Sequence, residues 1–339
     1  MHKNDNRYFM INMKFSPRVS VAVIIYGVEK YIERCARSLF EQTYPNIEYV
    51  FVNDCTPDKS IDLLMRVIED YPERKKDIKI VHHEKNMGSA CARNDAVKYC
   101  TSEFLTHVDS DDWLDPDMVN LMVEKQLQTH ADIVSVGWII HHFNGKVDFV
   151  DEPVHPDTHS MTLALLKPTQ APHVWGRLIR RSLYVDNNIK AVRGVNIAED
   201  WCCIPKLTFY ARKLAFVDKC LYHYHMENPS SVMFMASSYY RPDLCRQQMQ
   251  AIDELKKFFV DKDRDYYEAL LGIELRETQN YMNQCLQHSD RHFFYELAPR
   301  INKENEHLWD MLGNHNYLFI YIKKKYYLHK IYLYLRDLK

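Results

Sequence analysis

The sequence has no uninterrupted run of about 20 apolar residues, the length that a membrane-spanning helix requires. It also has no C-x-x-C pair: its nine cysteines are scattered, and Cys202 and Cys203 are adjacent. That distribution suits neither a disulfide framework nor a zinc ribbon. The first 18 residues include basic side chains but no apolar core of signal-peptide length. We therefore expect a protein of the reducing cytoplasm.

An excess of one charge is missing as well, because 44 Lys and Arg residues oppose 46 Asp and Glu residues, a formal net charge of -2. This balance gives no reason to expect a nucleic-acid partner. Glycine is scarce, with eight residues in 339, and only Gly27 follows the first apolar run. That position therefore has no glycine-rich phosphate loop. Any site for a phosphorylated ligand must be built from local groups.

Between Val19 and Trp138, short apolar runs alternate with segments of helical periodicity. The runs VSVAVIIY, IEYVFVND, IKIVHH, EFLTHVD and ADIVSVGW have the composition of buried strands. The segments between them place apolar residues three and four apart, as in the helix predicted from Ile32 to Phe40. This alternation predicts a sheet covered by helices, an α/β fold. From about Tyr239 onward we predict a mainly helical region.

The run EFLTHVD leads into the motif Asp109-Ser110-Asp111-Asp112, which has three carboxylates within four residues. Carboxylates this close repel one another, and Mg²⁺ or Mn²⁺ relieves the repulsion while also taking oxygens from a diphosphate. The alternative is a solvated acidic helix start. Ligands of open α/β sheets bind beyond the carboxyl ends of the strands, and both Asp54 and Asp109 end such runs.

These segments resemble the nucleotide-binding half of family 2 glycosyltransferases of the bacterial surface-polysaccharide type. The resemblance is dense in VSVAVIIYGVEKYIERCARSLFEQTYPNIEYVFVNDCTPDKS, NMGSACARN and HVDSDDWL, and it resumes at VWGRLIRRSLYVDNNI, IAED and YHYHMENPSSV. It implies the GT-A fold, a nucleotide-diphospho-sugar transferase fold with a Rossmann-like mixed sheet flanked by helices, followed here by a C-terminal helical region. It also implies transfer of a sugar, with inversion, from a nucleotide diphosphate donor to an acceptor hydroxyl.

The resemblance assigns donor-binding roles to residues of the first half. Asp54 matches the aspartate that binds the base, and Arg93 matches an arginine that lies against the nucleotide. The same pocket is expected to include Tyr26, Gly27, Glu29, Asp109, Ser110, Asp112 and Trp175. From the residues alone, Asp54 is better explained as a turn residue and Arg93 as a solvated helix residue.

Four positions depart from the family pattern: Ile24 and Gly27 stand where a proline and an asparagine are usual, and Asn53 and Cys55 where an aspartate and a glycine are usual. The change at Asn53 bears on the choice of base, because an amide can donate a hydrogen bond where a carboxylate only accepts. Uridine is the expected nucleoside.

The metal in this resemblance is Mn²⁺ or Mg²⁺, held by Asp109 and Asp111. His225 of the YHYH run is expected as a further ligand, with His223 as the other candidate. A histidine in an aromatic strand is also commonly structural. The pairs His82-His83 and His141-His142 are expected at the surface, at the ends of strands.

Glu199 and Asp200 match the family's E-D motif, in which the aspartate is the catalytic base. Asp200 is expected to take the proton of the acceptor hydroxyl, a contribution of about 10² to 10⁴ in rate. Glu199 is the alternative base. From the residues alone, the pair suits equally the start of a helix, where acidic side chains favour the helix dipole.

We expect an N-terminal extension over residues 1–18, a catalytic domain over 19–238 and a mainly helical region over 239–339. Within the catalytic domain, residues 19–117 are the nucleotide and metal half and 118–238 the acceptor half. The C-terminal run YLFIYIKKKYYLHKIYLYLRDLK fits an amphipathic helix at the inner face of the cell membrane, or a helix packed on the catalytic domain. The expected acceptor is a glycan or a lipid-linked glycan.

Two other functions stay open from the sequence. One is a non-catalytic nucleotide- or glycan-binding module with the same fold, which the presence of Asp200 and of all three carboxylates of the DSDD motif disfavours. The other is a sugar-nucleotide nucleotidyltransferase, which the lack of a glycine-rich loop disfavours.

Overall fold

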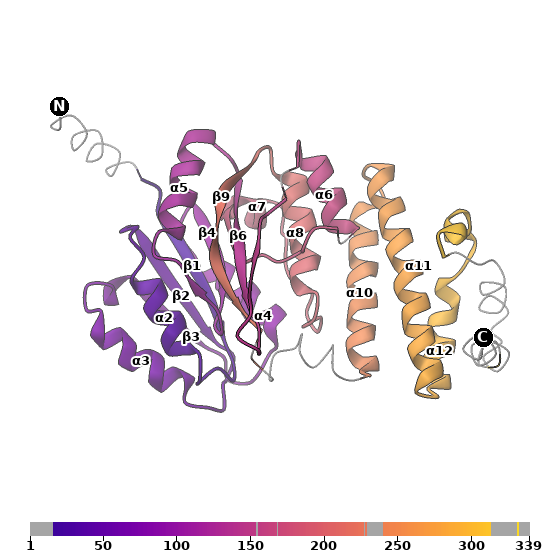
Figure 1. Cartoon of the computed structure of the whole chain (residues 1–339), viewed down its shortest axis with the longest axis horizontal. Helices are drawn as coiled ribbons and strands as arrows, with labels where there is room; N and C mark the ends of the chain where they lie inside the picture. The colour runs from indigo at the N-terminus through magenta and orange to yellow at the C-terminus, as the bar shows by residue number, and fades with distance from the viewer. Residues whose placement is uncertain are drawn as a thin grey trace. The chain divides into compact units, whose positions relative to one another are not determined.

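The computed structural model describes residues 16–153, 155–167, 169–226, 228, 240–312 and 331. The chain divides into two compact units. The first comprises Met1–Met161 and Pro172–Phe234, and the second comprises Thr162–Ala171 and Met235–Lys339 (Figure 1).

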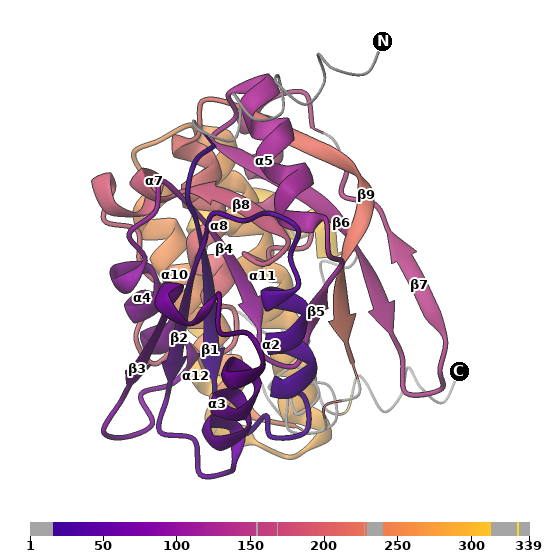
Figure 2. The same cartoon turned by 90° about the vertical axis from the view of Figure 1, so that its left-hand side faces the viewer.

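Within the described residues, the first unit is built on a nine-stranded sheet of order β3-β2-β1-β4-β8-β6-β9-β5, with β7 paired to β6. The strands are β1 (Val19–Ile25), β2 (Ile47–Asn53), β3 (Ile78–His82), β4 (Phe104–Asp109), β5 (Trp113–Leu114), β6 (Ile133–His141), β7 (Val147–Val150), β8 (Arg177–Arg180) and β9 (Leu214–His225). The first four strands are parallel, as the alternation predicts. Because β8 runs antiparallel to both β4 and β6, the whole sheet is mixed. At the right-hand margin of Figure 2, β7 extends the sheet beyond β6.

Helices cover the sheet of the first unit. They are α2 (Ile32–Phe40), α3 (Ser60–Asp70), α4 (Ser89–Tyr99), α5 (Met118–Thr129), α7 (Arg181–Asp186) and α8 (Glu199–Tyr210), with the 3₁₀ turn η1 (Lys75–Asp77). Alternate residues of β1, from Val19 to Ile25, pack in one core with the apolar faces of α2, α3 and α5. Helix α4 contacts β1 and β2 through small residues such as Ala92 and Ala96. Nearly every residue of β1 is buried, which explains why its sequence is continuously apolar.

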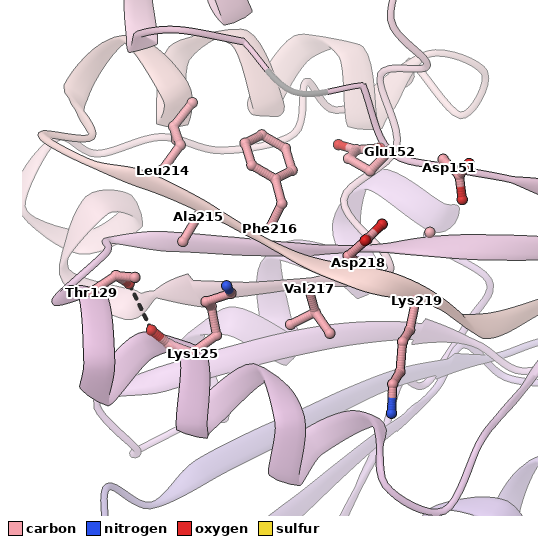
Figure 3. A pocket seen from close by; sticks show the side chains of 11 residues that line it. Lys125, Thr129, Asp151, Glu152, Leu214, Ala215, Phe216, Val217, Asp218 and Lys219 are labelled. Carbon is pink, nitrogen blue, oxygen red and sulfur yellow. Dashed lines mark hydrogen bonds between the residues drawn. The ribbon is translucent and has the colours of Figure 1, made fainter.

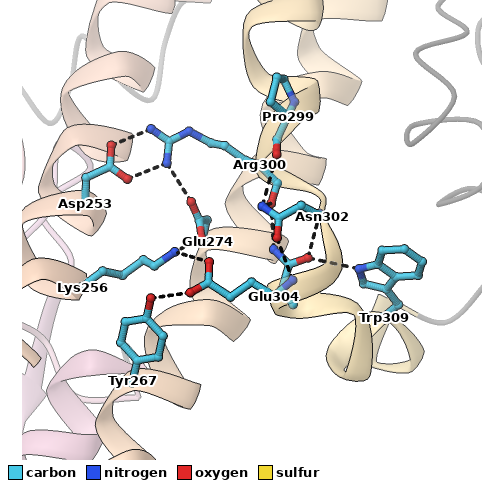
Figure 4. Close-up of polar contacts among 10 residues, drawn as sticks. Asp253, Lys256, Tyr267, Glu274, Pro299, Arg300, Asn302, Glu304 and Trp309 are labelled. Atoms are coloured by element: carbon cyan, nitrogen blue, oxygen red, sulfur yellow. Dashed lines mark hydrogen bonds and ion pairs between the residues drawn. The ribbon is translucent and has the colours of Figure 1, made fainter. Parts of the chain in front are cut away.

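The second unit is helical. It contains α10 (Pro242–Phe259), α11 (Arg264–Gln287), α12 (Arg291–Leu297), η2 (Ala298–Arg300) and η3 (Lys303–Leu312), while α6 (Thr158–Leu166) spans the boundary between the units. The buried carboxylate of Glu274 accepts hydrogen bonds from Lys256 at 2.7 Å and Arg300 at 2.8 Å, and Arg300 also pairs with Asp253 (Figure 4). These ion pairs join α10, α11 and η2, and they neutralise a carboxylate that is 4% exposed.

None of the described helices is long and apolar enough to cross a membrane. The C-terminal amphipathic segment predicted from the sequence lies outside the described residues, apart from Ile331. The N-terminal extension lies outside them as well, apart from residues 16–18.

Candidate active site

The carboxyl ends of β1, β2 and β4 meet at one edge of the sheet. Ile24 pairs with Asp109, and Ile25 pairs with Asn53. The loops that follow these three strands therefore lie next to one another, and they contain Tyr26, Asp54 and Ser110. This is the edge at which ligands of such sheets bind.

Asp112 joins the DSDD loop to β9 through buried hydrogen bonds. It is 1% exposed; its Oδ2 accepts a hydrogen bond from the Tyr222 hydroxyl at 2.6 Å, and its Oδ1 accepts one from the backbone N–H of His225 at 2.7 Å. The Tyr222 hydroxyl also accepts a hydrogen bond from the backbone N–H of Asp109 at 3.2 Å. Asp112 thus ties the loop to β9, and its contact with the donor stays a prediction. Ser110, 6% exposed, is enclosed in the same loop.

Asp109 and Asp111 are the carboxylates of this loop that remain available to a ligand. Asp109 has a side chain that is 28% exposed. Asp111 accepts a hydrogen bond from Asn228 at 2.9 Å, and burial together with the nearby Asp109 raises the pKa of its carboxyl to about 6. A cation placed between the two would remove this repulsion, and hard divalent cations prefer such oxygens. The pair fits a metal that keeps its other coordination positions for water or a diphosphate.

His225 does not complete this pair. The described residues hold no group of three or more His, Cys, Asp or Glu side chains arranged to bind one metal ion. The imidazole of His225 instead packs against Tyr31, with 5.0 Å between the ring centroids. The backbone N–H of His225 holds Asp112 in the structure, and the role of this histidine as a metal ligand stays a prediction.

Arg93 lies between the DSDD loop and the E-D pair. Its guanidinium is within 3.4 Å of Asp109, 3.3 Å of Glu199 and 3.0 Å of Asp200. The residue is 6% exposed, so it is not the solvated helix residue that α4 alone suggests. No sequence pattern indicates that one cation pairs with three carboxylates that lie up to 107 positions away along the chain.

Glu199 and Asp200 form the first turn of α8, which begins after Ala198. Ala198 has a φ of 72°, a conformation that non-glycine residues adopt at a cost and that is common at functional sites. Asp200 Oδ2 accepts a hydrogen bond from the backbone N–H of Val174 at 3.0 Å. Burial and the charge of Asp200 raise the pKa of Glu199 to about 7, and burial raises the pKa of Asp200 as well. The pair therefore holds a proton more readily than free carboxylates do.

Trp175 lies in a stack of rings next to this pair. Its ring lies 3.6 Å from that of His173 and 4.4 Å from that of Tyr222, both nearly parallel to it. Trp175 is 8% exposed, and it connects the segment that holds Asp200 to the tyrosine that holds Asp112. The stack therefore connects the DSDD loop with the E-D pair.

Asp54 is 4% exposed and holds the segment after β3 in place. Its Oδ1 contacts His83 Nδ1 at 2.7 Å and accepts from the N–H of Met87, while its Oδ2 accepts from the N–H of Gly88 at 2.8 Å. The other ring nitrogen of His83 lies 3.0 Å from Asp95. His83 was expected at the surface, but its side chain is 9% exposed between two carboxylates. The expectation failed because both partners come from other segments of the chain.

The loop after β1, at the same edge of the sheet, contains Tyr26, Gly27 and Glu29. Tyr26 is half exposed, and Gly27 has a φ of 68° with its N–H donating to Thr56 Oγ1 at 2.9 Å. Glu29 accepts from the N–H of Lys59 at the start of α3. These contacts join the loop after β1 to the loop after β2.

A second stack of side chains, around Trp113, was not predicted from the sequence. Arg34 lies 3.6 Å above the Trp113 ring and donates to the carbonyl of Asp111. The neighbours of Trp113 also include His223 and His141, whose ring centroids lie 4.8 and 4.4 Å from that of Trp113. His223 is thus a packing residue, and His141 is not a simple surface residue. The W following DSDD was the available signal, since Trp is rarely exposed without a partner.

Parallel strands that end in a D-x-D loop facing an E-D pair define a GT-A nucleotide-diphospho-sugar transferase fold. The model for glycosyl transferase family 2 matches residues 20–186, so this segment of the chain is similar to that family. EpsJ of Bacillus subtilis (strain 168), an uncharacterized glycosyltransferase, is 31% identical over 228 residues. The alignment covers 64% of this chain and 63% of EpsJ, so it spans less than two thirds of that relative.

Solved structures share the fold. The crystal structure of S. aureus TarS 1-349 in complex with UDP-GlcNAc superposes with a TM-score of 0.70 at 21% identity, and covers 92% of this chain and 89% of that one. The mannosyltransferase PcManGT from Pyrobaculum calidifontis, in complex with GDP-Man and Mn²⁺, superposes with a TM-score of 0.55 at 16% identity, with 96% and 89% covered. Both likenesses extend across most of the chain and confirm the predicted GT-A fold.

Proposed function

We propose that this protein is an inverting glycosyltransferase that moves a sugar from a UDP-sugar to a hydroxyl of a glycan or a lipid-linked glycan. The observation that carries the proposal is the cluster of Asp109, Arg93, Glu199 and Asp200, which joins the predicted donor loop to an acidic pair across one arginine. The TarS structure with bound UDP-GlcNAc supports the choice of donor class.

The donor half comprises residues 19–117 in this proposal. Tyr26, Gly27 and Glu29 line its mouth, and Asp54 fixes the loop against which the base would lie. Among the described residues, Asp54 Oδ2 accepts one hydrogen bond, and a carboxylate oxygen has two lone pairs. One acceptor position of Asp54 therefore remains for an N–H of the base. Arg93 pairs with Asp109, Glu199 and Asp200 next to this site.

Mn²⁺ or Mg²⁺ is the proposed cofactor, held by Asp109 and Asp111. When bound, the cation supplies positive charge to the departing diphosphate. The raised pKa of Asp111 supports this assignment, because burial and the charge of Asp109 both disfavour its ionised form. The Mn²⁺ in the PcManGT complex supports it from a structural neighbour.

Asp200 is the proposed base. The N–H of Val174 fixes one of its carboxylate oxygens, and the other, Oδ1, is buried beside Arg93 without a hydrogen-bond partner among the described residues, so it is the oxygen that we assign to the acceptor's proton. One base on one face of the donor is what a single inverting displacement requires. Glu199, with a pKa of about 7, is the adjacent group that can share this proton.

A screen of sugar nucleotides by thermal unfolding, with Mn²⁺ and with EDTA, tests the proposal. A ligand at 100 times its dissociation constant adds about 2.7 kcal/mol to the free energy of unfolding. We expect UDP-sugars to raise the melting temperature only with Mn²⁺, and Asp111→Asn to lose the effect. No stabilisation by any nucleotide sugar would refute the proposal.

A further inference from the structure

A groove of about 520 Å³ lies in the first unit, beside the amino-terminal half of β9 (Figure 3). Its walls come from α5, β6, β9 and the segment after β7, and they include Lys125, Glu152, Phe216, Val217, Asp218 and Lys219. None of the carboxylates of the DSDD loop or of the E-D pair lines it. Tyr222 lies six positions after Phe216 along β9, which at about 3.3 Å per residue is about 20 Å.

A β-bulge forms the floor of the groove. The register of β6 against β9 shifts on either side of Gly137, which lines the groove. A Cβ at Gly137 would lie 2.8 Å from both the Cys220 sulfur and the Val150 carbonyl oxygen. Bulges re-aim side chains, and a strand glycine allows close approach. The groove is therefore a feature of the strand geometry.

One carboxylate oxygen of Glu152 has no hydrogen-bond partner among the described residues. The residue is 7% exposed, and its Oε1 accepts a hydrogen bond from Arg177. Its Oε2 is buried and has no hydrogen-bond partner within the described residues. A buried acceptor left unpaired is costly, so a ligand that donates a hydrogen bond here would be stabilised.

The lining selects among ligand classes. The lining includes three carboxylates, of Asp151, Glu152 and Asp218, and two ammonium groups, of Lys125 and Lys219, and Arg177 already neutralises Glu152. This near balance of charge favours neither an anion nor a cation, and these acidic side chains form no metal-binding group among the described residues. Phe216 and Val217, which point to opposite sides of β9 in Figure 3, each add an apolar side chain. Hydroxyl donors, oxygen acceptors and an apolar C–H face occur together in a saccharide.

We propose that this groove is a second saccharide-binding site, which holds a neutral segment of the acceptor glycan away from the reacting hydroxyl. Its use in synthesis rests on the proposed transferase function, whereas saccharide binding itself does not. A glycan anchored here would stay bound between successive encounters with the donor, as expected for a tethered ligand.

The proposal is tested by titrating Asp200→Asn protein with lactose, maltose and chitobiose. Saturation-transfer NMR measures binding first without nucleotide and then with UDP and Mn²⁺. We expect at least one disaccharide to bind, and UDP with Mn²⁺ to leave its affinity unchanged. Glu152→Gln should weaken binding about tenfold, because an amide donor replaces the accepting Oε2. Phe216→Ala should weaken it too, and it serves if Glu152→Gln fails to fold. Phe149→Ala, a 71% exposed phenylalanine outside the groove, is the matched control.

Binding of none of the three disaccharides would overturn the proposal. So would equal affinity in the folded groove variants and in the Phe149 control, or displacement of the disaccharide by UDP. The assay needs neither donor nor turnover. Disaccharide binding to the Asp200→Asn protein, together with no sugar transfer from any donor by the parent protein, would therefore refute the transferase function and leave the groove assignment standing.

Discussion

The Nε atom of Arg93 lies 3.0 Å from Oδ1 of Asp200, so an arginine of α4 and the first turn of α8 form one ion pair. The same guanidinium reaches Asp109 at the end of β4. The predicted metal loop and the predicted base therefore share a single counter-charge. Because Arg93 is almost fully buried, solvent screens this coupling weakly.

Arg93→Ala is expected to lower the free energy of unfolding by about 3 kcal/mol, since removing one partner of a buried ion pair leaves the other charges uncompensated. Arg93→Lys should lose less, because it retains the charge while it loses the planar fork. Urea unfolding of both variants measures the difference. If Arg93→Ala unfolds at the same urea concentration as the parent, the three ion pairs do not contribute to stability.

Tyr222→Phe should loosen the DSDD loop. The hydroxyl joins the Asp112 carboxylate to the backbone of Asp109, and its loss leaves a buried acceptor unpaired at a cost of about 1–3 kcal/mol. We expect a lower melting temperature and several-fold weaker Mn²⁺-dependent binding of UDP. Tyr210→Phe, on the last turn of α8, is a matched control. Equal UDP affinity in the Tyr222 variant and the control would show that the loop does not need this support.

The local part of the fold could be predicted from the sequence. Strands β1 to β4 and helices α2 to α5 follow from apolar periodicity, which each segment carries by itself. Strand β8 could not be predicted in this way. It has four residues, and one of them, Arg177, is 1% exposed because Glu152 neutralises it from 25 positions away. Such a strand is defined by its partners.

The candidate site was predicted as a set of residues, but the contacts among those residues were not predicted. Asp112 and His225 were predicted to contact ligands, and the structure adds a hydrogen bond from the backbone N–H of His225 to the Asp112 carboxylate. The 113 positions between them hide that contact from any sequence pattern. Cys55 illustrates the opposite case: it stands where the family has glycine, and its φ of 57° shows why glycine is usual there.

The dependence of UDP binding on a divalent cation tests the metal assignment. Asp111→Asn removes one of two expected oxygen ligands, and we expect it to abolish the gain in UDP affinity that Mn²⁺ gives the parent. Calorimetry with Mn²⁺ and with EDTA measures the gain. Equal UDP affinity of the parent protein in both conditions would remove the metal from the account.

The raised pKa of Glu199 predicts a pH-dependent stability. Because its folded pKa of about 7 lies above the usual value of 4.5, the folded state binds this proton more tightly than the unfolded state. The stabilisation is complete below about pH 4.5 and is lost as the pH rises through 7, by at most about 3 kcal/mol. Urea unfolding at pH 5 and pH 8 should show this loss in the parent and not in Glu199→Gln. An equal loss in both proteins would place the titration elsewhere.

The Asp200→Asn variant tests the central claim most directly, in an assay that measures donor binding and sugar transfer on the same preparation. The amide nearly preserves the shape of the side chain but cannot take the acceptor's proton. We predict unchanged donor affinity and transfer that is slower by about a hundredfold or more, with Glu199→Gln measured in parallel. Transfer at the parent rate by Asp200→Asn would contradict the account, and its loss in Glu199→Gln alone would move the base to Glu199.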